Sequence, residues 1–313
     1  MKTKEWMDFW LANCKKNTVK YHTYVQYRDI AALHLVPAFG EYGLNELTAE
    51  KIQIFLAEKR RRGNLRTGAG LSGRSVNLLF GVLKNALDCA VRFGHISVNP
   101  CSRAVRVKEE NRETAVFSRA EQRKIERICM EKGGIYTGIV LCLHTGIKIG
   151  ELLSLTWRDV DFRSNLLRVE KTVVRLRAED GGYTDYIDRP KSPSSRRAIP
   201  LSPKAAEALK EMKKHAGGEY VFCGRKGRVS VRAYQHRFEN LLRKNNIRVL
   251  HFHALRHTFA TRVMECGVDV KTLSGALGHY SAGFTLNTYT HATAQMKQDA
   301  ADTIGGVISQ QMR

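Results

Sequence analysis

Hydrophobic residues recur at helical spacing through the first hundred positions of the chain. Thr48 caps a predicted helix that buries Ile52 and Phe55 and ends at Gly63. Two aromatic stripes precede it, and a longer aliphatic stripe follows it and ends at Gly94. Their members are Trp6, Phe9 and Trp10; Tyr21, Tyr24 and Tyr27; and Val76, Leu79, Phe80, Leu83, Leu87 and Val91. The pattern predicts an all-α domain over residues 1–107, with these stripes in its core.

The periodicity stops after this region. Residues 101–115 are polar, charged and poor in apolar side chains, which is typical of a linker. We place the linker at 108–117 and a second domain at 118–313.

The second domain has a mixed pattern. Ser118 and Glu121 form a capping box for a helix. Residues 166–177 favour β structure, a glycine turn follows, and a second β run surrounds Tyr183–Ile187. Further helical patterns begin at 202, 231, 253 and 270, and the tail 293–313 is predicted to be helical. The expected fold is mixed α/β, mainly helical, with a small antiparallel sheet.

Charge adds a class of partner. The 313 residues include 52 Lys+Arg and 30 Asp+Glu, a formal net charge of +22. Residues 1–110 contain 18 basic and 10 acidic side chains, so both regions are basic. Two basic domains favour a clamp around a polyanion, with nucleic acid the first candidate. A generic basic protein is the alternative.

Other classes are disfavoured. No run of eighteen apolar residues exists, so no membrane span is predicted, and the N-terminal stretch is too polar for a signal peptide. The seven cysteines are scattered, odd in number and without a CxxC spacing. They indicate reduced thiols in a cytoplasmic protein rather than a disulfide framework or a zinc site.

Candidate chemistry is concentrated in residues 251–291. His253 and Arg256 share one helical face, and an arginine beside imidazoles suits a centre that binds phosphate and moves protons. Tyr289 lies ten residues after His279, and an activated tyrosine can be a covalent nucleophile. Each feature alone is more often structural, so the order and spacing of all of them carry the hypothesis.

These motifs resemble a known family. HALRHTFAT (253–261), LGH (277–279) and TLNTYTH (285–291) are similar to the catalytic signature of tyrosine recombinases, the phage-integrase family. The interval from the LGH histidine to the tyrosine is ten here and nine in the commoner pattern, which we interpret as a longer loop. Residues 1–107 resemble the family's core-binding domain, and no arm-binding domain is expected before them.

Two further segments fit the resemblance. TGIKIGE (145–151) has Lys148 where the family has a phosphate-binding arginine, and Glu151 matches the acidic residue that supports the site. The pattern PKS, then SxRxIPL, resembles the hairpin that bears the catalytic lysine, which assigns that role to Lys191.

The resemblance implies a reaction. Tyr289 would attack the phosphorus, form a 3′-phosphotyrosyl link and release a 5′-hydroxyl, which Lys191 would protonate. His253 would assist proton transfer at the tyrosine. Arg256, His279 and position 148 would hold the non-bridging oxygens. Neither a metal nor a nucleotide cofactor is implied, and the sequence contains no GxxxxGK[ST] loop.

Lysine at position 148 changes the expected rate. An ammonium is a point charge that does not reproduce the planar fork of arginine. We expect DNA binding to survive and cleavage to be slow.

The expected function is site-specific recombination that integrates or excises a phage or mobile element. The expected partners are double-stranded DNA, further copies of the chain (four in the full synapse) and accessory DNA-bending or excision factors, all at the bacterial nucleoid. A type IB topoisomerase and a non-catalytic DNA-binding protein with this fold are the alternatives.

Overall fold

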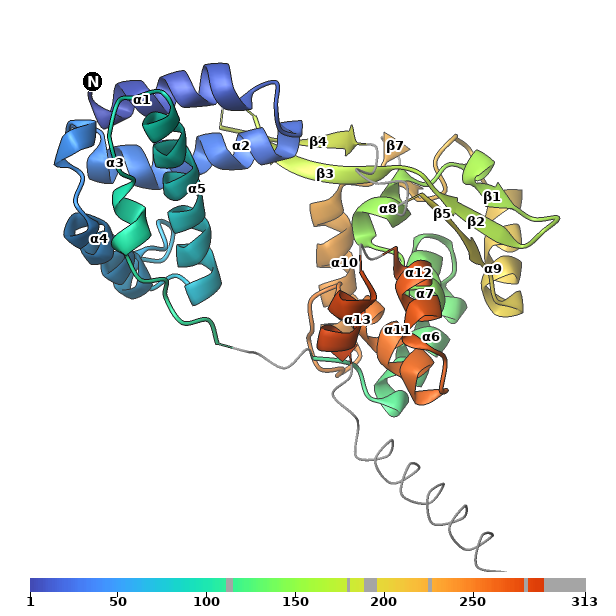
Figure 1. Ribbon diagram of the computed structural model, residues 1–313. Helices are drawn as coiled ribbons and strands as arrows, with labels where there is room; N and C mark the ends of the chain where they lie inside the picture. Colours follow the sequence, from blue (N-terminus) through green and yellow to red (C-terminus); the bar gives the residue numbers. More distant parts are fainter. Residues whose placement is uncertain (111–114, 179–180, 189–195, 225–226, 279–280, 290–313) are drawn as a thin grey trace, which may run out of the picture. The chain divides into compact units, whose positions relative to one another are not determined.

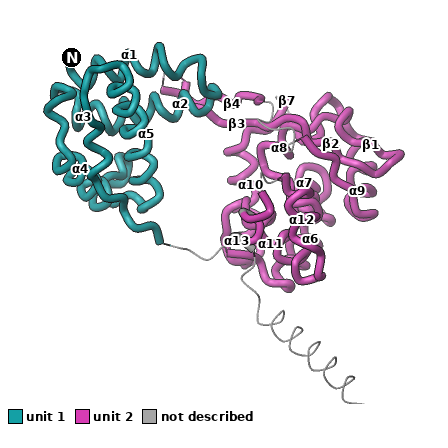
Figure 2. Tube along the Cα trace, in the orientation of Figure 1, with its two compact units in different colours: residues 1–112 teal, residues 113–313 magenta. Residues whose placement is uncertain are grey.

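The computed structural model describes residues 1–110, 115–178, 181–188, 196–224, 227–278 and 281–289. The chain divides into two compact units, Met1–Arg112 and Glu113–Arg313, which are coloured separately in Figure 2. Each unit has its own hydrophobic core.

Unit 1 is helical, as the periodicity predicts. Two of its helices begin at caps: the Thr48 hydroxyl accepts from the Lys51 N–H at 3.2 Å, and Ser72 does the same for Ser75. Its α-helices are α1 (Thr3–Phe9), α2 (Tyr21–Ile30), α3 (Val36–Phe39), α4 (Ala49–Arg62) and α5 (Gly73–Arg92), and π-helical turns extend α1 and α2 over Trp10–Lys15 and Ala31–Leu35 (Figure 1).

The aromatic stripes are only partly core. Trp6 and Trp10 are fully buried, and the Trp6 indole N–H donates to the Ala86 carbonyl at 3.0 Å. Phe9 and Tyr21, in contrast, are exposed. Periodicity therefore identifies the packed face of these helices, while the edge positions of each stripe face solvent.

The segment that follows α5 is bound to unit 1. The Gln53 amide donates to the Val105 carbonyl and accepts from the Val105 N–H, at 3.4 and 2.9 Å. The Asn77 side-chain amide likewise donates to the Val107 carbonyl and accepts from the Val107 N–H, at 2.9 and 3.0 Å. Arg60 pairs with Glu110 at 2.7 Å. Side-chain amides of α4 and α5 thus bind the backbone of this extended segment.

Unit 2 is mainly helical. The Ser118–Glu121 capping box is confirmed, because Ser118 Oγ accepts from the Glu121 N–H and the Glu121 carboxylate accepts from the Ser118 N–H. The helices of this unit are α6 (Arg119–Lys132), α7 (Thr137–Thr145), α8 (Ile149–Ser154), α9 (Pro203–Lys214), α10 (Val231–Lys244), α11 (Ala254–Glu265), α12 (Val270–Leu277) and α13 (Ala282–Tyr289) (Figure 1).

The β structure is antiparallel, and the predicted strand over 166–177 is two strands. β2 (Leu166–Val169) pairs with β1 (Val160–Asp161) and β5 (Arg197–Pro200), whereas β3 (Thr172–Arg177) pairs with β4 (Tyr183–Asp188). Lys171 lies between β2 and β3. Its carbonyl accepts a hydrogen bond from Ser154 Oγ of α8 at 2.8 Å. A third sheet pairs β6 (Cys223–Gly224) with β7 (Gly227–Arg228).

The packing of unit 2 brings the motif-bearing helices together. α11 packs against α7, α12 and α13, and α12 packs against β5 (Figure 1). α8 lies close against β3, since a Cβ at Gly150 would be 2.4 Å from the Val173 carbonyl oxygen. The Thr258 hydroxyl of α11 accepts from the Phe117 N–H at 3.0 Å, which fixes the start of the unit to this helix.

Candidate active site

The turn before α8 presents Lys148. Gly146 ends α7 with φ +64°, and a side chain there would collide with Phe259 and Leu277, so the turn requires glycine. Lys148 then occupies the N-cap position of α8, and its N–H donates to the Glu151 carboxylate at 3.0 Å. The Lys148 ammonium is 3.9 Å from the same carboxylate, and the Lys148 side chain is 45% exposed. The ammonium is therefore held near Glu151 and still reaches solvent.

Glu151 is buried in an ion pair. Arg197, the first residue of β5, donates from Nη1 and Nη2 to the two carboxylate oxygens at 3.1 and 2.8 Å. Burial by itself raises the pKa of this carboxyl, but the hydrogen bonds and charge of Arg197, with the charge of Lys148, lower the pKa below its ordinary value. Glu151 is thus a carboxylate at neutral pH.

Arg256 joins two of the predicted motifs. It lies in the first turn of α11 and is only 2% exposed. Its Nη1 donates to the Gly146 carbonyl at 2.8 Å and its Nη2 to the Leu277 carbonyl at 2.9 Å. The guanidinium therefore fixes the turn that carries Lys148 to the end of α12.

His253 precedes α11 at its N-cap position. Its ring is perpendicular to that of His257, with centroids 4.5 Å apart. Desolvation, followed by the positive charges of Arg256, His251 and Lys148, lowers the pKa of His253 to about 4. The imidazole is neutral at pH 7, so it has an unprotonated ring nitrogen that can accept a proton.

We expect the His253 resonance of the free protein to titrate near pH 4 rather than near 6.5. The folded protein binds the His253 proton more weakly than the unfolded chain, whose histidine has a pKa of 6.5. The contribution of His253 to folding stability is therefore complete above pH 6.5 and is lost as the pH falls from 6.5 to about 4. The measurement is an NMR titration, with the resonance assigned by its loss in His253→Gln. A midpoint near 6.5 would contradict the crowded cationic setting described above.

Lys148, Glu151 and Arg256 meet at the Gly146 turn, because Glu151 accepts from the Lys148 N–H and Arg256 donates to the Gly146 carbonyl. Burial lowers the pKa of the Lys148 ammonium, Arg256 and Arg197 lower it further, and Glu151 opposes them. Four residues predicted from separate motifs, Lys148, Glu151, His253 and Arg256, are therefore neighbours in the fold. Mutual repulsion among the cations favours an anion between them.

The other predicted residues are only partly described. Tyr289 is the last residue of α13, which packs against α11 and α12, and its side chain is outside the described part. Lys191 and His279 lie outside the described residues; β4 and β5 flank the first, and Gly278 ends α12 immediately before the second.

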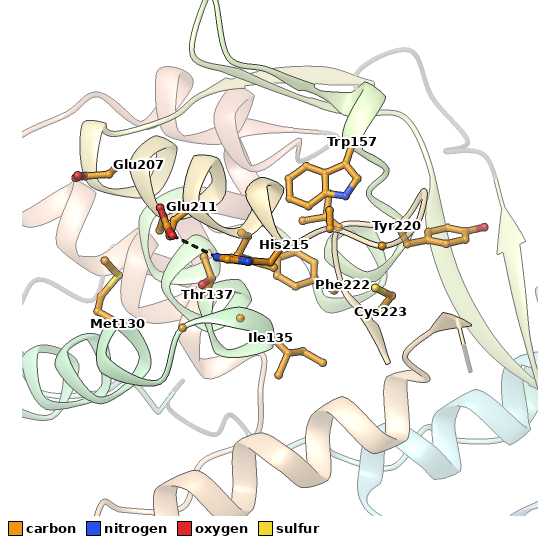
Figure 3. Close-up of a pocket in the computed structure, with 17 residues that line it drawn as sticks. Met130, Ile135, Thr137, Trp157, Glu207, Glu211, His215, Tyr220, Phe222 and Cys223 are labelled. Atoms are coloured by element: carbon orange, nitrogen blue, oxygen red, sulfur yellow. Dashed lines mark ion pairs between the residues drawn. The ribbon is translucent and has the colours of Figure 1, made fainter. Parts of the chain in front are cut away.

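A mostly apolar cavity of unit 2 lies apart from the described residues of this site. It measures about 460 Å³ and lies between α9, the start of α7 and the segment before β6 (Figure 3). Its walls are largely apolar, with Glu211 paired to His215 at 3.5 Å on the edge. Of the predicted site residues whose side chains the structure describes, Lys148, Glu151, His253 and Arg256, none lines it.

Among the described residues, no three His, Cys, Asp or Glu side chains group as a metal site. Over the same ranges, every helix is too short or too polar to cross a membrane. All seven cysteines are free thiols.

Family comparisons decide the class of the protein. The description "Phage integrase family" matches residues 104–296, and "Phage integrase, N-terminal SAM-like domain" matches residues 3–59. The chain belongs to the phage integrase family. These are the tyrosine recombinases, enzymes that cut and rejoin DNA, so the resemblance and the enzyme class predicted from the motifs are confirmed.

Relatives match at moderate identity. A tyrosine recombinase XerC-like protein of Caldanaerobacter subterraneus subsp. tengcongensis is 29% identical over 324 residues, covering 95% of this chain and 81% of that protein. The transposase from transposon Tn916 of Enterococcus faecalis is 31% identical over 185 residues, covering 52% of this chain and 45% of that protein.

Solved structures share the fold. A Tn1549 transposon integrase fragment in complex with a circular intermediate DNA superposes with a TM-score of 0.80 at 23% identity, covering 97% of this chain and 99% of that one. A chain of a lambda integrase tetramer bound to a Holliday junction superposes with a TM-score of 0.68 at 21% identity. The match covers 90% of this chain and 78% of that one. The predicted fold, a helical N-terminal domain followed by a mainly helical α/β domain, is confirmed.

One residue of the site was not assigned a role from the sequence. Arg197 is the arginine of the SxRxIPL pattern, where the resemblance drew attention to Lys191. The structure shows that Arg197 is the partner of Glu151. Its position in that pattern, two residues before the buried Ile199, was the available signal.

Proposed function

We propose that this chain is a site-specific DNA recombinase that integrates or excises a mobile element through a 3′-phosphotyrosyl intermediate. The observation that carries the proposal is the meeting of Lys148, Glu151, His253 and Arg256 at one site of unit 2. Their charges suit the non-bridging oxygens of a phosphodiester.

The geometry supports a division of roles. Arg256, which donates to the Gly146 carbonyl, and Lys148, two residues further along, supply positive charge, and Glu151 accepts from the Lys148 N–H. The neutral His253 ring accepts the proton that Tyr289 gives up as it attacks the phosphorus. By sequence, His279 adds a donor to the phosphate and Lys191 protonates the departing 5′-oxygen. Resealing by a new 5′-hydroxyl reverses these steps.

The partners follow from the family and the charge. A net charge of +22 favours double-stranded DNA as the substrate. In unit 1, Arg61 and Arg62 at the end of α4 are exposed and are candidate phosphate contacts. By analogy with the lambda integrase tetramer, four copies would act on two duplexes, with accessory DNA-bending or excision factors. Such an enzyme acts in the cytoplasm, at the nucleoid.

The test is strand joining on a selected DNA site. Binding sequences would first be enriched from genomic fragments with Tyr289→Phe, and two duplexes that contain the selected site would then be incubated with the Lys148→Arg protein. A recombinase produces exchanged strands that require the site on both duplexes. Relaxation of plasmids that lack the site would identify a type IB topoisomerase, and tight binding with neither product would identify a non-catalytic DNA-binding protein.

A further inference from the structure

Arg197 occupies a buried position among three segments of the site. Its side chain is 6% exposed, and all three of its nitrogen groups donate hydrogen bonds. Nη1 and Nη2 bind the Glu151 carboxylate, and Nε binds the Ala276 carbonyl of α12 at 2.8 Å. Its own backbone begins β5, next to the segment that contains Lys191.

The chain makes room for this side chain. Gly278 ends α12 with φ +66°, and a Cβ there would lie 3.0 Å from Arg197 Nη1. Glycine therefore serves two needs at this position: the left-handed backbone that ends α12, and the close approach of the guanidinium. Arg197 contacts α12 at the residues that lead directly into His279.

Two cations, Arg197 and Lys148, lie near the Glu151 carboxylate. This carboxylate accepts two hydrogen bonds from Arg197, whereas the Lys148 ammonium is 3.9 Å away on a side chain that is 45% exposed. The fork of Arg197 satisfies both carboxylate oxygens in good geometry. The ammonium consequently stays outside a close pair with Glu151 and remains accessible to a ligand.

We propose that Arg197 is a positioning residue of the recombinase: by engaging Glu151 and the end of α12, it keeps the cation at position 148 available to the DNA phosphate. This rests on the proposed function. Without Arg197, the Glu151 carboxylate would pair with the cation at position 148 and withdraw it from the phosphate. A displacement of about 1 Å at such a centre costs ~10² in rate.

The test is a double-substitution cycle in the Lys148→Arg protein. The variants are Arg197→Met, Glu151→Gln and the pair of both changes, with Arg197→Lys as a second variant should Arg197→Met fail to fold. Arg168→Met is the matched control, because Arg168 is an exposed arginine of β2 at 3.5 Å from Asp161. The readouts are the single-turnover rate of covalent complex formation on a nicked duplex, the DNA dissociation constant and the hydrogen exchange of the residue-148 amide.

We expect Arg197→Met to lower the rate ~10²-fold with the DNA dissociation constant changed less than about threefold, and to speed exchange at position 148. Adding Glu151→Gln should recover about tenfold of the loss, since the competing carboxylate is then gone. Arg168→Met should leave the rate unchanged. Losses that multiply in the double variant, or an unchanged rate in Arg197→Met, would overturn the proposal. If the parent protein, with Lys148→Arg as its single change, binds the site and forms no covalent complex, the proposed function itself is wrong. This inference then falls with it.

Discussion

Replacing Lys148 with arginine is expected to accelerate covalent complex formation by ~10²–10³, because an oriented donor to the phosphate is restored. Lys148 supplies charge beside Glu151, but its ammonium lacks the planar fork that binds two oxygens at once. DNA affinity should change little, since the formal charge is the same. The measurement is the single-turnover rate on a nicked duplex that traps the cleaved strand.

The matched control for this change is Lys171→Arg. Lys171 is also a partly exposed lysine of unit 2, at 3.9 Å from Asp159. The same substitution there should leave the rate unaltered. A chain that cleaves equally fast with lysine or arginine at position 148 would show that this position does not limit catalysis.

Replacing Arg256 with lysine in the Lys148→Arg protein is expected to lower the cleavage rate by ~10²–10³. Lysine keeps the charge but does not hold the Gly146 and Leu277 carbonyls together while also presenting donors to a phosphate. Loss of these buried hydrogen bonds should also reduce stability by about 1–3 kcal/mol. Stopped-time cleavage assays and thermal unfolding of the same preparations measure the two effects.

Arg262 separates the chemical effect from the structural one. It lies on the same helix, α11, and binds the Phe117 carbonyl at 2.8 Å and the Glu265 carboxylate. Arg262→Lys should therefore lower stability while leaving the cleavage rate per folded molecule intact. Equal losses of rate in both variants would mean that Arg256 acts only through the packing of α11.

Local sequence rules predicted the helix starts well. Thr48 and Ser118 cap their helices in the structure as expected, because an N-cap depends on residues only two or three positions apart. Family motifs placed His253, Arg256, Lys148 and Glu151, and the structure brings these four together.

Long-range features were beyond such rules. The β-rich run at 166–177 gave no sign that β2 and β3 pair with different strands, or that the Lys171 carbonyl between them accepts a hydrogen bond from Ser154. The pairing of Arg197 with Glu151 joins residues 46 positions apart. The binding of Val105 by Gln53 likewise depends on the tertiary fold. Periodicity predicts which face of a helix or strand is buried, but it does not predict which distant residue contacts that face.

The central claim is that Tyr289 becomes covalently linked to DNA. The most direct measurement is mass spectrometry of the peptide that carries the 3′-phosphate after the Lys148→Arg protein is trapped on a nicked duplex. We predict a nucleotide adduct on Tyr289, absent in Tyr289→Phe and retained in Tyr280→Phe, the other tyrosine of this stretch. An adduct on a different residue, or none despite specific DNA binding, would contradict the account.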